Sequence, residues 1–429
     1  MKHAVIIGGG MAGLVASAVA ADRFDTVTLI DKDTLPDGPE PRKAIPQGNH
    51  VHALLKSGEQ FLCALFPGFR ETALNAGCLE FRVRSQWRTY GPKGWIEPVD
   101  IGLTALAQTR PLIEHVVRGL VSGLQNVRPV TGTVANLRNA GDSTDVLLSD
   151  GTQMDADLVI DASGRGGGTG PWLVALGGPD VPVEDYKPEI RYASALFSRG
   201  ITSGPDFGGW LMFTPAPARR GAVAVPVESG RWLLTAYTRL GEPVPKSEED
   251  FRAFLKDLPD PKISTLVEGE FMQTDISTYA IPKVQFRRFD HVADAMPDGY
   301  LPLGDTIATF SPINAQGMSV AALQAKALKE VLEQHPGDTG WRRSVTQSYL
   351  RQATIPAEWA WNLCQALDAG FEELRASISV PARDLSQTMK RVAEHAGTHP
   401  ELIGAMGRAI HLLESPETFT GAVSRILGD

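Results

Sequence analysis

Apolar and polar residues at the start of the chain alternate in a way that predicts a strand, a helix and a second strand. The apolar run "HAVIIG" at residues 3–8 ends in glycine, which is typical of a buried strand that leads into a tight turn. The alanine-rich stretch "MAGLVASAVAA" that follows indicates a helix, and "TVTLID" at 26–31 indicates a second strand. Together they form a β-α-β unit, the building block of a parallel sheet.

The same reading predicts a strand-rich middle and a helical end. A hairpin is expected from residue 145, with a turn at 149–151, and it runs into a buried strand that ends in "ASGR" at 162–165. Four further strands are predicted at "IRYASALF", "GWLMF", "GAVAVPVE" and "RWLLTAY", the last two joined by a turn at 229–230. Helices are predicted at 110–124, after the cap Ser247, at 317–332, and from about 340 onward, with a kink at Pro356.

Composition narrows the function classes. The chain has 429 residues, 43% of them apolar, and a formal net charge of -9, which argues against a broad nucleic-acid surface. The three cysteines are far apart and predict neither a disulfide framework nor a zinc site. No apolar stretch reaches the ~18 residues of a membrane span, and the first strand begins at once. We therefore expect a cytoplasmic protein without a membrane span, a metal or a nucleic-acid partner.

A glycine fingerprint stands between the first strand and its helix. Gly8, Gly10 and Gly13 form G-x-G-x-x-G, in which the glycines allow a tight turn, the approach of a pyrophosphate and close packing of helix on strand. Asp31 ends the second strand, where a carboxylate accepts hydrogen bonds from an adenosine ribose. The remaining candidates for dinucleotide contact in these two segments are Met11, Ala12 and Lys32.

A second motif, "GDTIATFSPINAQGMS" at 304–319, carries a resemblance to a known family. Gly304, Asp305, Pro312, Gly317 and Met318 match a pattern of the FAD-dependent monooxygenases related to para-hydroxybenzoate hydroxylase. The resemblance implies that Asp305 holds the ribityl chain of FAD and that the turn from 312 to 317 passes beside the isoalloxazine ring. The positive end of the helix that begins near Gly317 suits the anionic reduced flavin.

Two further segments resemble the same family. Arg110 in "QTRPLIEHVV" matches an arginine that opens a helix and reaches the FAD, and Asp161 with Gly164 matches the middle motif, although Ser163 departs from its usual Asp-Gly ending. Val134 completes the cofactor candidates in this part of the chain. The glycine-rich "GRGGGTG" does not fit a second G-x-G-x-x-G, so we predict no separate nicotinamide domain. NAD(P)H is expected as electron donor, directly or through a flavin reductase.

The stretch "RKAIPQGNHVH" at 42–52 resembles more specifically the epoxidases of polyether-antibiotic biosynthesis, of the lasalocid and monensin type. The matching residues, and so candidates for the flavin side of the site, are Arg42, Lys43, Pro46, Gln47, His50 and His52. The histidines have three readings: a metal site, which lacks a visible third ligand; a structural role bonded to backbone or flavin; and direct acid/base help.

The resemblance implies an α/β fold with a Rossmann-like FAD-binding domain at 1–180 and 281–335, an inserted β-sheet substrate domain at 181–280 and a helical segment at 336–429. It implies a monooxygenase, an epoxidase or hydroxylase, that transfers one oxygen from a flavin C4a-hydroperoxide to an apolar, polyketide-like molecule. No catalytic side chain is predicted, because the oxidant is the cofactor's own. Candidate substrate-lining residues are Trp210, Met212, Phe213, Trp232 and Tyr237, and about half of them are expected to be core residues only. Residues 286–288 either meet an acidic substrate tail or are surface charge.

Other functions stay open. A cyclase that binds FAD for its shape alone, a plain FAD-binding protein or an alkene reductase would share these motifs. A flavin halogenase would need a catalytic lysine and W-x-W-x-I-P, whereas Trp359-Ala360-Trp361 is followed by Asn-Leu-Cys and Lys56 lacks the surrounding pattern.

Overall fold

A five-stranded parallel sheet forms the base of the molecule in the computed structural model, which describes residues 2–200, 208–337 and 340–428. The strand order is β19-β11-β1-β2-β7. The strands are β1 (His3–Ile7), β2 (Thr26–Asp31), β7 (Val127–Thr131), β11 (Leu158–Asp161) and β19 (Tyr300–Pro302). The predicted β-α-β unit is confirmed, with α1 (Met11–Ala21) between β1 and β2. β1 lies at the centre because its apolar residues can be buried on both faces.

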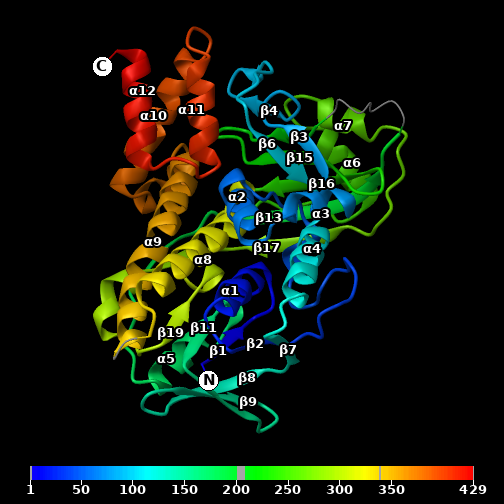
Figure 1. Cartoon of the computed structure of the whole chain (residues 1–429). Coiled ribbons are helices and arrows are strands. Elements are labelled where there is room, and N and C mark those ends of the chain that lie inside the picture. Colours follow the sequence, from blue (N-terminus) through cyan, green and yellow to red (C-terminus); the bar gives the residue numbers. More distant parts are fainter. Residues whose placement is uncertain (1, 201–207, 338–339, 429) are drawn as a thin grey trace.

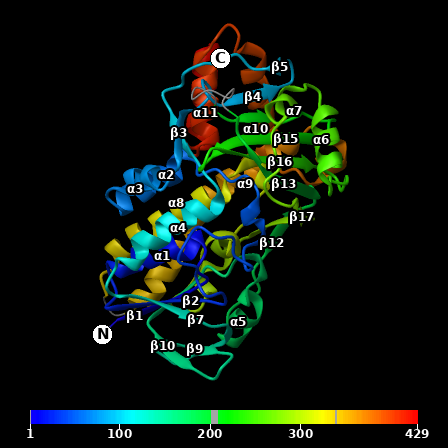
Figure 2. The ribbon, with the colours of Figure 1, turned by 90° about the vertical axis from the view of Figure 1, so that its right-hand side faces the viewer.

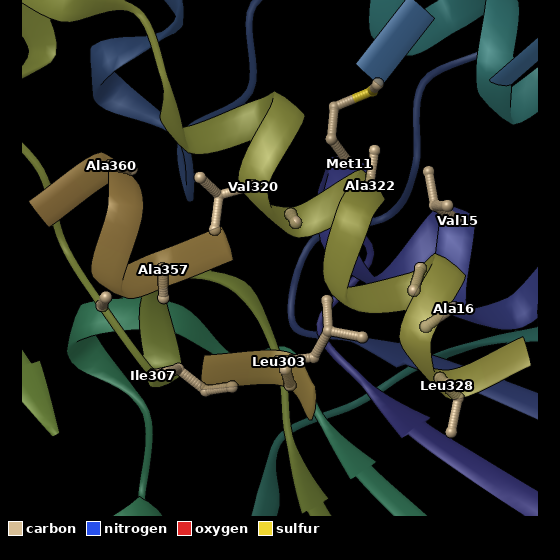
Figure 3. Packing of buried hydrophobic residues seen from close by; sticks show 14 of the residues in the cluster. Met11, Val15, Ala16, Leu303, Ile307, Val320, Ala322, Leu328, Ala357 and Ala360 are labelled. Carbon is tan, nitrogen blue, oxygen red and sulfur yellow. The ribbon is translucent and has the colours of Figure 1, made fainter. Parts of the chain in front are cut away.

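Helices from distant parts of the sequence cover this sheet. α1 packs against α8 (Gly317–Gln334), which in turn packs against α9 (Trp341–Asp368) (Figure 1). Figure 3 shows how small residues allow this close approach, with Ala16 on α1, Ala322 on α8 and Ala357 on α9. α4 (Arg110–Ser122) also contacts α1, and α5 (Thr169–Ala175) covers a small sheet of β8 (Val134–Asn139), β9 (Thr144–Leu148) and β10 (Gln153–Ala156).

A seven-stranded sheet makes up the second body, in the order β17-β13-β16-β15-β14-β4-β5. Its strands are β4 (Arg88–Gly91), β5 (Gly94–Trp95), β13 (Ile190–Ser198), β14 (Trp210–Met212), β15 (Arg220–Val227), β16 (Arg231–Thr238) and β17 (Ser277–Ile281). α6 (Glu248–Lys256) and α7 (Lys262–Leu266) lie beside this sheet in both views (Figures 1 and 2). β4 and β5 come from the part of the chain that the sequence pattern assigns to the first domain.

The remaining elements are two short strand pairs, two helices after the 42–55 loop, the C-terminal helices and several 3-10 turns. The remaining strands form the pairs β3 (Leu79–Arg82) with β6 (Thr104–Ala107) and β12 (Val183–Tyr186) with β18 (Val284–Arg287). α2 (Lys56–Leu65) and α3 (Phe69–Asn75) follow the 42–55 loop, and the C-terminal helices are α10 (Val380–His395), α11 (Glu401–Ile410) and α12 (Pro416–Leu427). Short 3-10 turns are η1 (Pro46–Asn49), η2 (Gly164–Gly166), η3 (Phe289–Ala295), η4 (Gly304–Thr306), η5 (Pro312–Asn314) and η6 (Glu372–Ser377). Among the described residues, no helix is long and apolar enough to cross a membrane.

Local sequence signals are confirmed in several elements, and so is the α/β fold class. Ser247 caps α6, since its Oγ accepts a hydrogen bond from the Asp250 amide. Ser229 and Gly230 both have positive φ, 61° and 64°, as a two-residue hairpin turn requires. Pro356 lies inside α9, and from residue 340 the described chain is almost entirely helical.

The first turn of α2 is completed by a residue from the far end of the chain. His411 accepts hydrogen bonds from the Lys56 amide at its Nδ1 (3.0 Å) and from the Ser57 amide at its carbonyl oxygen (3.3 Å). The Leu55 amide, just before the helix, donates to Ser319 Oγ of α8 (2.9 Å). Free N–H groups at a helix start need such partners, so the C-terminal helices and α8 both hold α2 in place.

We predict that His411 makes the protein acid-sensitive. Burial, and secondarily Lys56, lower the pKa of His411 to about 4, below the 6.5 of an unfolded histidine. The unfolded chain therefore binds this proton first as pH falls, so the stabilising contribution is complete above pH 6.5 and is lost toward pH 4, on the order of 3 kcal/mol. His411→Asn keeps an acceptor but does not titrate. Between pH 7.5 and 4.5, the midpoint temperature of thermal unfolding should fall less steeply for His411→Asn than for the parent or for the exposed control His395→Asn. Equal slopes in all three proteins would count against this role.

Candidate functional site

Three loops meet at the carboxyl ends of β1, β11 and β19. Gly8 has a φ of +105°, and a Cβ on it would lie 2.4 Å from the carbonyl oxygen of Ala162. A Cβ on Gly13 would lie 1.7 Å from the carbonyl oxygen of Gly8, so only glycine lets α1 begin so close to the turn. Gly10 precedes α1 without a side-chain cap, and the first turn of α1 contains no acidic residue. Its amides are therefore available to an anion.

Asp31 fixes the first loop. Its Oδ2 accepts a hydrogen bond from the Gly9 amide (2.6 Å), and its Oδ1 pairs with Nη2 of Arg42 (2.6 Å). The sequence assigns Asp31 to an adenosine ribose; in the structure it is buried, and it also anchors the glycine turn. Met11 is buried at the start of α1, whereas Lys32 and Lys43 are exposed and Gln47 is half-buried. Val134 is buried at the start of β8.

A buried cluster of charges lies beside this loop. Arg42 pairs with Glu114 (2.8 Å) and donates to the Gly9 carbonyl oxygen (2.9 Å), and Arg110 pairs with Glu114 (2.9 Å). Arg118 lies 3.8 Å from the same carboxylate. Burial lowers the pKa of Arg42, but Asp31 and Glu114 outweigh it, so the pKa is raised; for Arg110 burial dominates and its pKa is lowered. Asp33 also lies 3.7 Å from Nε of Arg42, so three guanidinium groups face three carboxylates. Nη1 of Arg110, which has no partner among the described residues, is the donor left for an anion.

The second glycine motif lies against the first. Gly304 has a φ of +70°, and a Cβ there would come within 2.9 Å of Ala12 Cβ on α1. Asp305 Oδ1 lies 3.8 Å from the position of a Cβ on Gly317, where α8 begins. Among the described residues, the Asp305 carboxylate has no hydrogen bond or ion pair. Burial raises its pKa, partly offset by Arg165, Arg110 and Arg287. Asp305 therefore stands between the starts of α1 and α8.

Asp161 differs from Asp305 because its acceptors are used within the protein. Its carboxylate accepts hydrogen bonds from Tyr300 (2.6 Å), Thr169 (2.7 Å), and both the amide and the hydroxyl of Ser163. It is fully buried. The structure therefore shows Asp161 holding the Ser163–Gly164 loop, and Gly164 is the part of this motif that lies next to Asp305.

The turn from Pro312 to Gly317 faces the seven-stranded sheet. Ile313 packs against Ile190, Tyr192 and Tyr237, with Phe213 beside them. Ala315 has a φ of +54°, which marks a tight turn, and Met318 is half-buried in the first turn of α8. Two predicted substrate-lining residues, Phe213 and Tyr237, thus lie over the predicted flavin turn.

Trp210, Met212 and Trp232 lie on the other face of that sheet and are not brought together with Tyr237. They pack with Phe251 and Leu255 of α6 in a separate core. Side chains alternate along a strand, so Trp232 and Tyr237 on β16, which are five residues apart, point to opposite faces. Of the five candidates, these three are therefore core residues, and only Phe213 and Tyr237 lie next to the predicted flavin turn.

The histidines of the 42–55 loop contact protein groups rather than one another's rings. His50 Nδ1 bonds to Ser194 Oγ (2.7 Å), and His52 Nδ1 donates to the His50 carbonyl oxygen (3.0 Å). Burial lowers the pKa of both to about 4. Among the described residues, no three His, Cys, Asp or Glu side chains gather as a metal would need.

The segment 286–288 is tied into the protein. Phe286 is fully buried, and Arg287 donates to the Thr306 carbonyl oxygen (2.8 Å). Arg288 pairs with Asp290 and with Glu358, and these hydrogen bonds raise its pKa despite burial. Arg288 therefore has its carboxylate partners within the chain.

Gln108 is a candidate that sequence reasoning missed. It is 1% exposed, yet neither of its side-chain polar atoms has a hydrogen-bond partner in the described structure. Nη1 of Arg110, two residues later, is likewise buried without a partner. Buried polar groups nearly always have partners, so both side chains are candidates for contact with a ligand. In the sequence, the position of Gln108 between the end of a strand and Thr109, which caps α4, could have marked it as a site residue.

These features together fit a dinucleotide. The glycine cradle lets a phosphate approach the backbone, and Arg110 and Gln108 have buried polar atoms without partners among the described residues. The Asp305 carboxylate likewise has no hydrogen bond or ion pair in the part of the chain that the structure describes. The fold is that of the flavin-dependent monooxygenases. The brominase Bmp2 superposes with a TM-score of 0.71 at 15% identity, covering 99% of both chains. The p-nitrophenol 4-monooxygenase PnpA from Pseudomonas putida gives 0.66 at 13% identity, covering 96% of this chain and 99% of that one.

Sequence comparison identifies the family. Protein Rv3254 of Mycobacterium tuberculosis is 30% identical over 356 residues, which cover 77% of this chain and 73% of that protein. The chain belongs to the family of this mycobacterial protein. No family model matches it.

We predict opposite effects of alanine at two helical glycines. Gly13→Ala places a Cβ on the Gly8 carbonyl oxygen and should lower the free energy of unfolding by roughly 1–3 kcal/mol or more, with loss of dinucleotide binding. Gly119→Ala in α4 meets open space and should stabilise by ~1 kcal/mol through helix propensity. Urea unfolding measures both, and equal stabilities would contradict the close contact.

Proposed function

We propose that this protein is an FAD-dependent monooxygenase, an epoxidase or hydroxylase, that inserts one oxygen atom from O2 into an apolar, polyketide-like molecule. The single observation that supports it most is Asp305, whose carboxylate lies between the starts of α1 and α8 and has no partner among the described residues. One FAD molecule could engage both glycine motifs there. The proposal divides the chain as the sequence suggests, with FAD on the parallel-sheet body and substrate on the seven-stranded sheet.

The proposed FAD contacts follow from the three loops. The amides at Gly10–Gly13 and the guanidinium of Arg110 would bind the pyrophosphate, and Asp31 the adenosine ribose. Asp305 would accept hydrogen bonds from the ribityl hydroxyls. Bound FAD, once reduced, supplies the oxygen that it takes from O2.

The chain's own residues would then position the substrate and exclude water. Tyr237, Tyr192 and Phe213 present aromatic surface next to Ile313 of the flavin-side turn. A dry, apolar surface protects a reactive oxygen donor from hydrolysis and favours an apolar substrate. The polyether-epoxidase resemblance of the 42–52 stretch supports an alkene-bearing polyketide and oxygen transfer to its double bond.

A flavin halogenase is the second candidate, because the brominase Bmp2 shares the fold over both whole chains. Two features weigh against it. Lys56 pairs with the buried Glu59 (3.1 Å), and Trp361 is buried in α9 against Tyr186. Substrate-dependent uptake of O2 without halide would support the monooxygenase; dependence on halide would support the halogenase; product formation without O2 uptake would support a redox-neutral cyclase.

We expect the purified protein to have a flavin absorption spectrum, and Asp305→Ala to weaken FAD retention at least about tenfold, as loss of a charged hydrogen-bond acceptor does. Asp298→Ala is the matched control, because Asp298 precedes the opposite end of β19 and pairs only with Arg343 among described residues. Flavin fluorescence during dialysis measures retention. A colourless parent that takes up no flavin, or equal retention in parent and Asp305→Ala, would contradict the assignment.

Reduction by NAD(P)H alone should be slow, because the chain has no second glycine fingerprint for a nicotinamide cofactor. Stopped-flow absorbance of the flavin under anaerobic conditions, with and without a flavin reductase, measures this. Fast and complete reduction without substrate or reductase would show a direct nicotinamide site.

A further inference from the structure

His50 has a buried ring nitrogen that its own protein leaves without a partner. The side chain is 2% exposed, and Nε2 has no hydrogen bond in the described structure, whereas Nδ1 bonds to Ser194 Oγ at 2.7 Å. The ring lies next to Tyr192 and Tyr279, with centroids 5.5 Å and 6.0 Å away. A buried polar atom of this kind is open to a partner that arrives with a ligand.

The hydrogen bonds around Ser194 decide which nitrogen of His50 bears the proton. The Val51 amide donates to Thr235 Oγ1 (3.0 Å), and Thr235 and Ser194 share a hydrogen bond of 2.6 Å. If Thr235 donates to Ser194, then Ser194 donates to His50 Nδ1, and every hydroxyl hydrogen has an acceptor. This arrangement leaves one group unsatisfied among the described residues, the Nε2–H of His50. The reverse direction leaves two, the Thr235 hydroxyl hydrogen and the lone pair of Nε2, and is therefore less favourable. The neutral imidazole is therefore protonated at Nε2.

Burial agrees with a neutral ring, since it lowers the pKa of His50 to about 4. At neutral pH Nε2–H is then a fixed, uncharged donor. The neighbouring His52 has the opposite tautomer, because its Nδ1 donates to a carbonyl oxygen and leaves Nε2 as an acceptor.

We propose that His50 donates this Nε2–H to an acceptor oxygen, of the ketone or similar carbonyl class, on an otherwise apolar substrate. The ring contacts of His50 come from β13 and β17 of the seven-stranded sheet, the body that the proposed function assigns to substrate. Tyr192, one of those contacts, packs against Ile313 on the flavin-side turn, which places the donor at the edge of the proposed reaction site. The inference rests on the proposed function for the identity of this site. Ser194 is a positioning residue that acts through His50.

The tautomer can be tested without flavin or turnover. Nitrogen-15 NMR of the full-length protein labelled at histidine, with the His50 signals identified by their loss in His50→Phe, should show a protonated Nε2 and a bare Nδ1 at neutral pH. Ser194→Ala should mix the two tautomers. A protonated Nδ1 in the parent would overturn the inference while leaving the FAD assignment untouched.

The acceptor can be tested with two probes of similar size, 1-tetralone and 1,2-dihydronaphthalene, titrated into the FAD-loaded protein by calorimetry. The parent should bind the ketone roughly 3- to 10-fold more tightly, as one neutral hydrogen bond allows. His50→Phe should remove this preference and keep FAD affinity, and Ser194→Ala should reduce the preference. A parent without preference for the ketone overturns the inference. So does a His50→Phe protein that keeps the preference. A His50→Phe protein that loses FAD affinity also overturns the inference, because it would show that the donor faces the flavin.

Discussion

The turns that lead into α1 and α8 come close together at the ends of the parallel strands because glycine stands at two tight contacts. Gly13 touches the Gly8 carbonyl oxygen and Gly304 touches Ala12, and a methyl group at either position would overlap its neighbour. Two positive helix ends are thus brought to one place. Asp305 and the guanidinium groups beside Glu114 are candidates for cofactor contact because they lie near these helix starts. The cofactor assignment therefore depends on the glycine contacts.

The arginine cluster shows how such a site remains stable before it holds anything. Glu114 accepts hydrogen bonds from Arg42 and Arg110 and lies near Arg118. Asp31 pairs with Nη2, the other terminal nitrogen of Arg42. Buried charges are costly unless paired, and here each pairing leaves part of the donor set unused. Nη1 of Arg110 is one such donor. The cluster therefore keeps its cations buried and paired, and one donor stays without a partner among the described residues.

Much of this architecture could be predicted from the sequence, and the remainder depends on register. The glycine motifs, the caps and the hairpin turns are local signals, because they require particular backbone angles within a few residues. Alternation along the predicted strand already implies that Trp232 and Tyr237 point to opposite faces. Which of the two faces meets the flavin-side turn depends on how the whole sheet is placed, and no local pattern specifies that. The contribution of β4 to the seven-stranded sheet and the missing partners of Gln108 likewise become visible only when distant segments are placed together.

His411 completes α2 across a separation of 355 residues in the chain. During synthesis, the amides of Lys56 and Ser57 emerge long before this imidazole exists. The loop that bears Arg42 and His50 leads directly into that helix, so its final position is reached only after almost the whole polypeptide has been made. The segment that is translated first would thus be among the last to reach its final conformation.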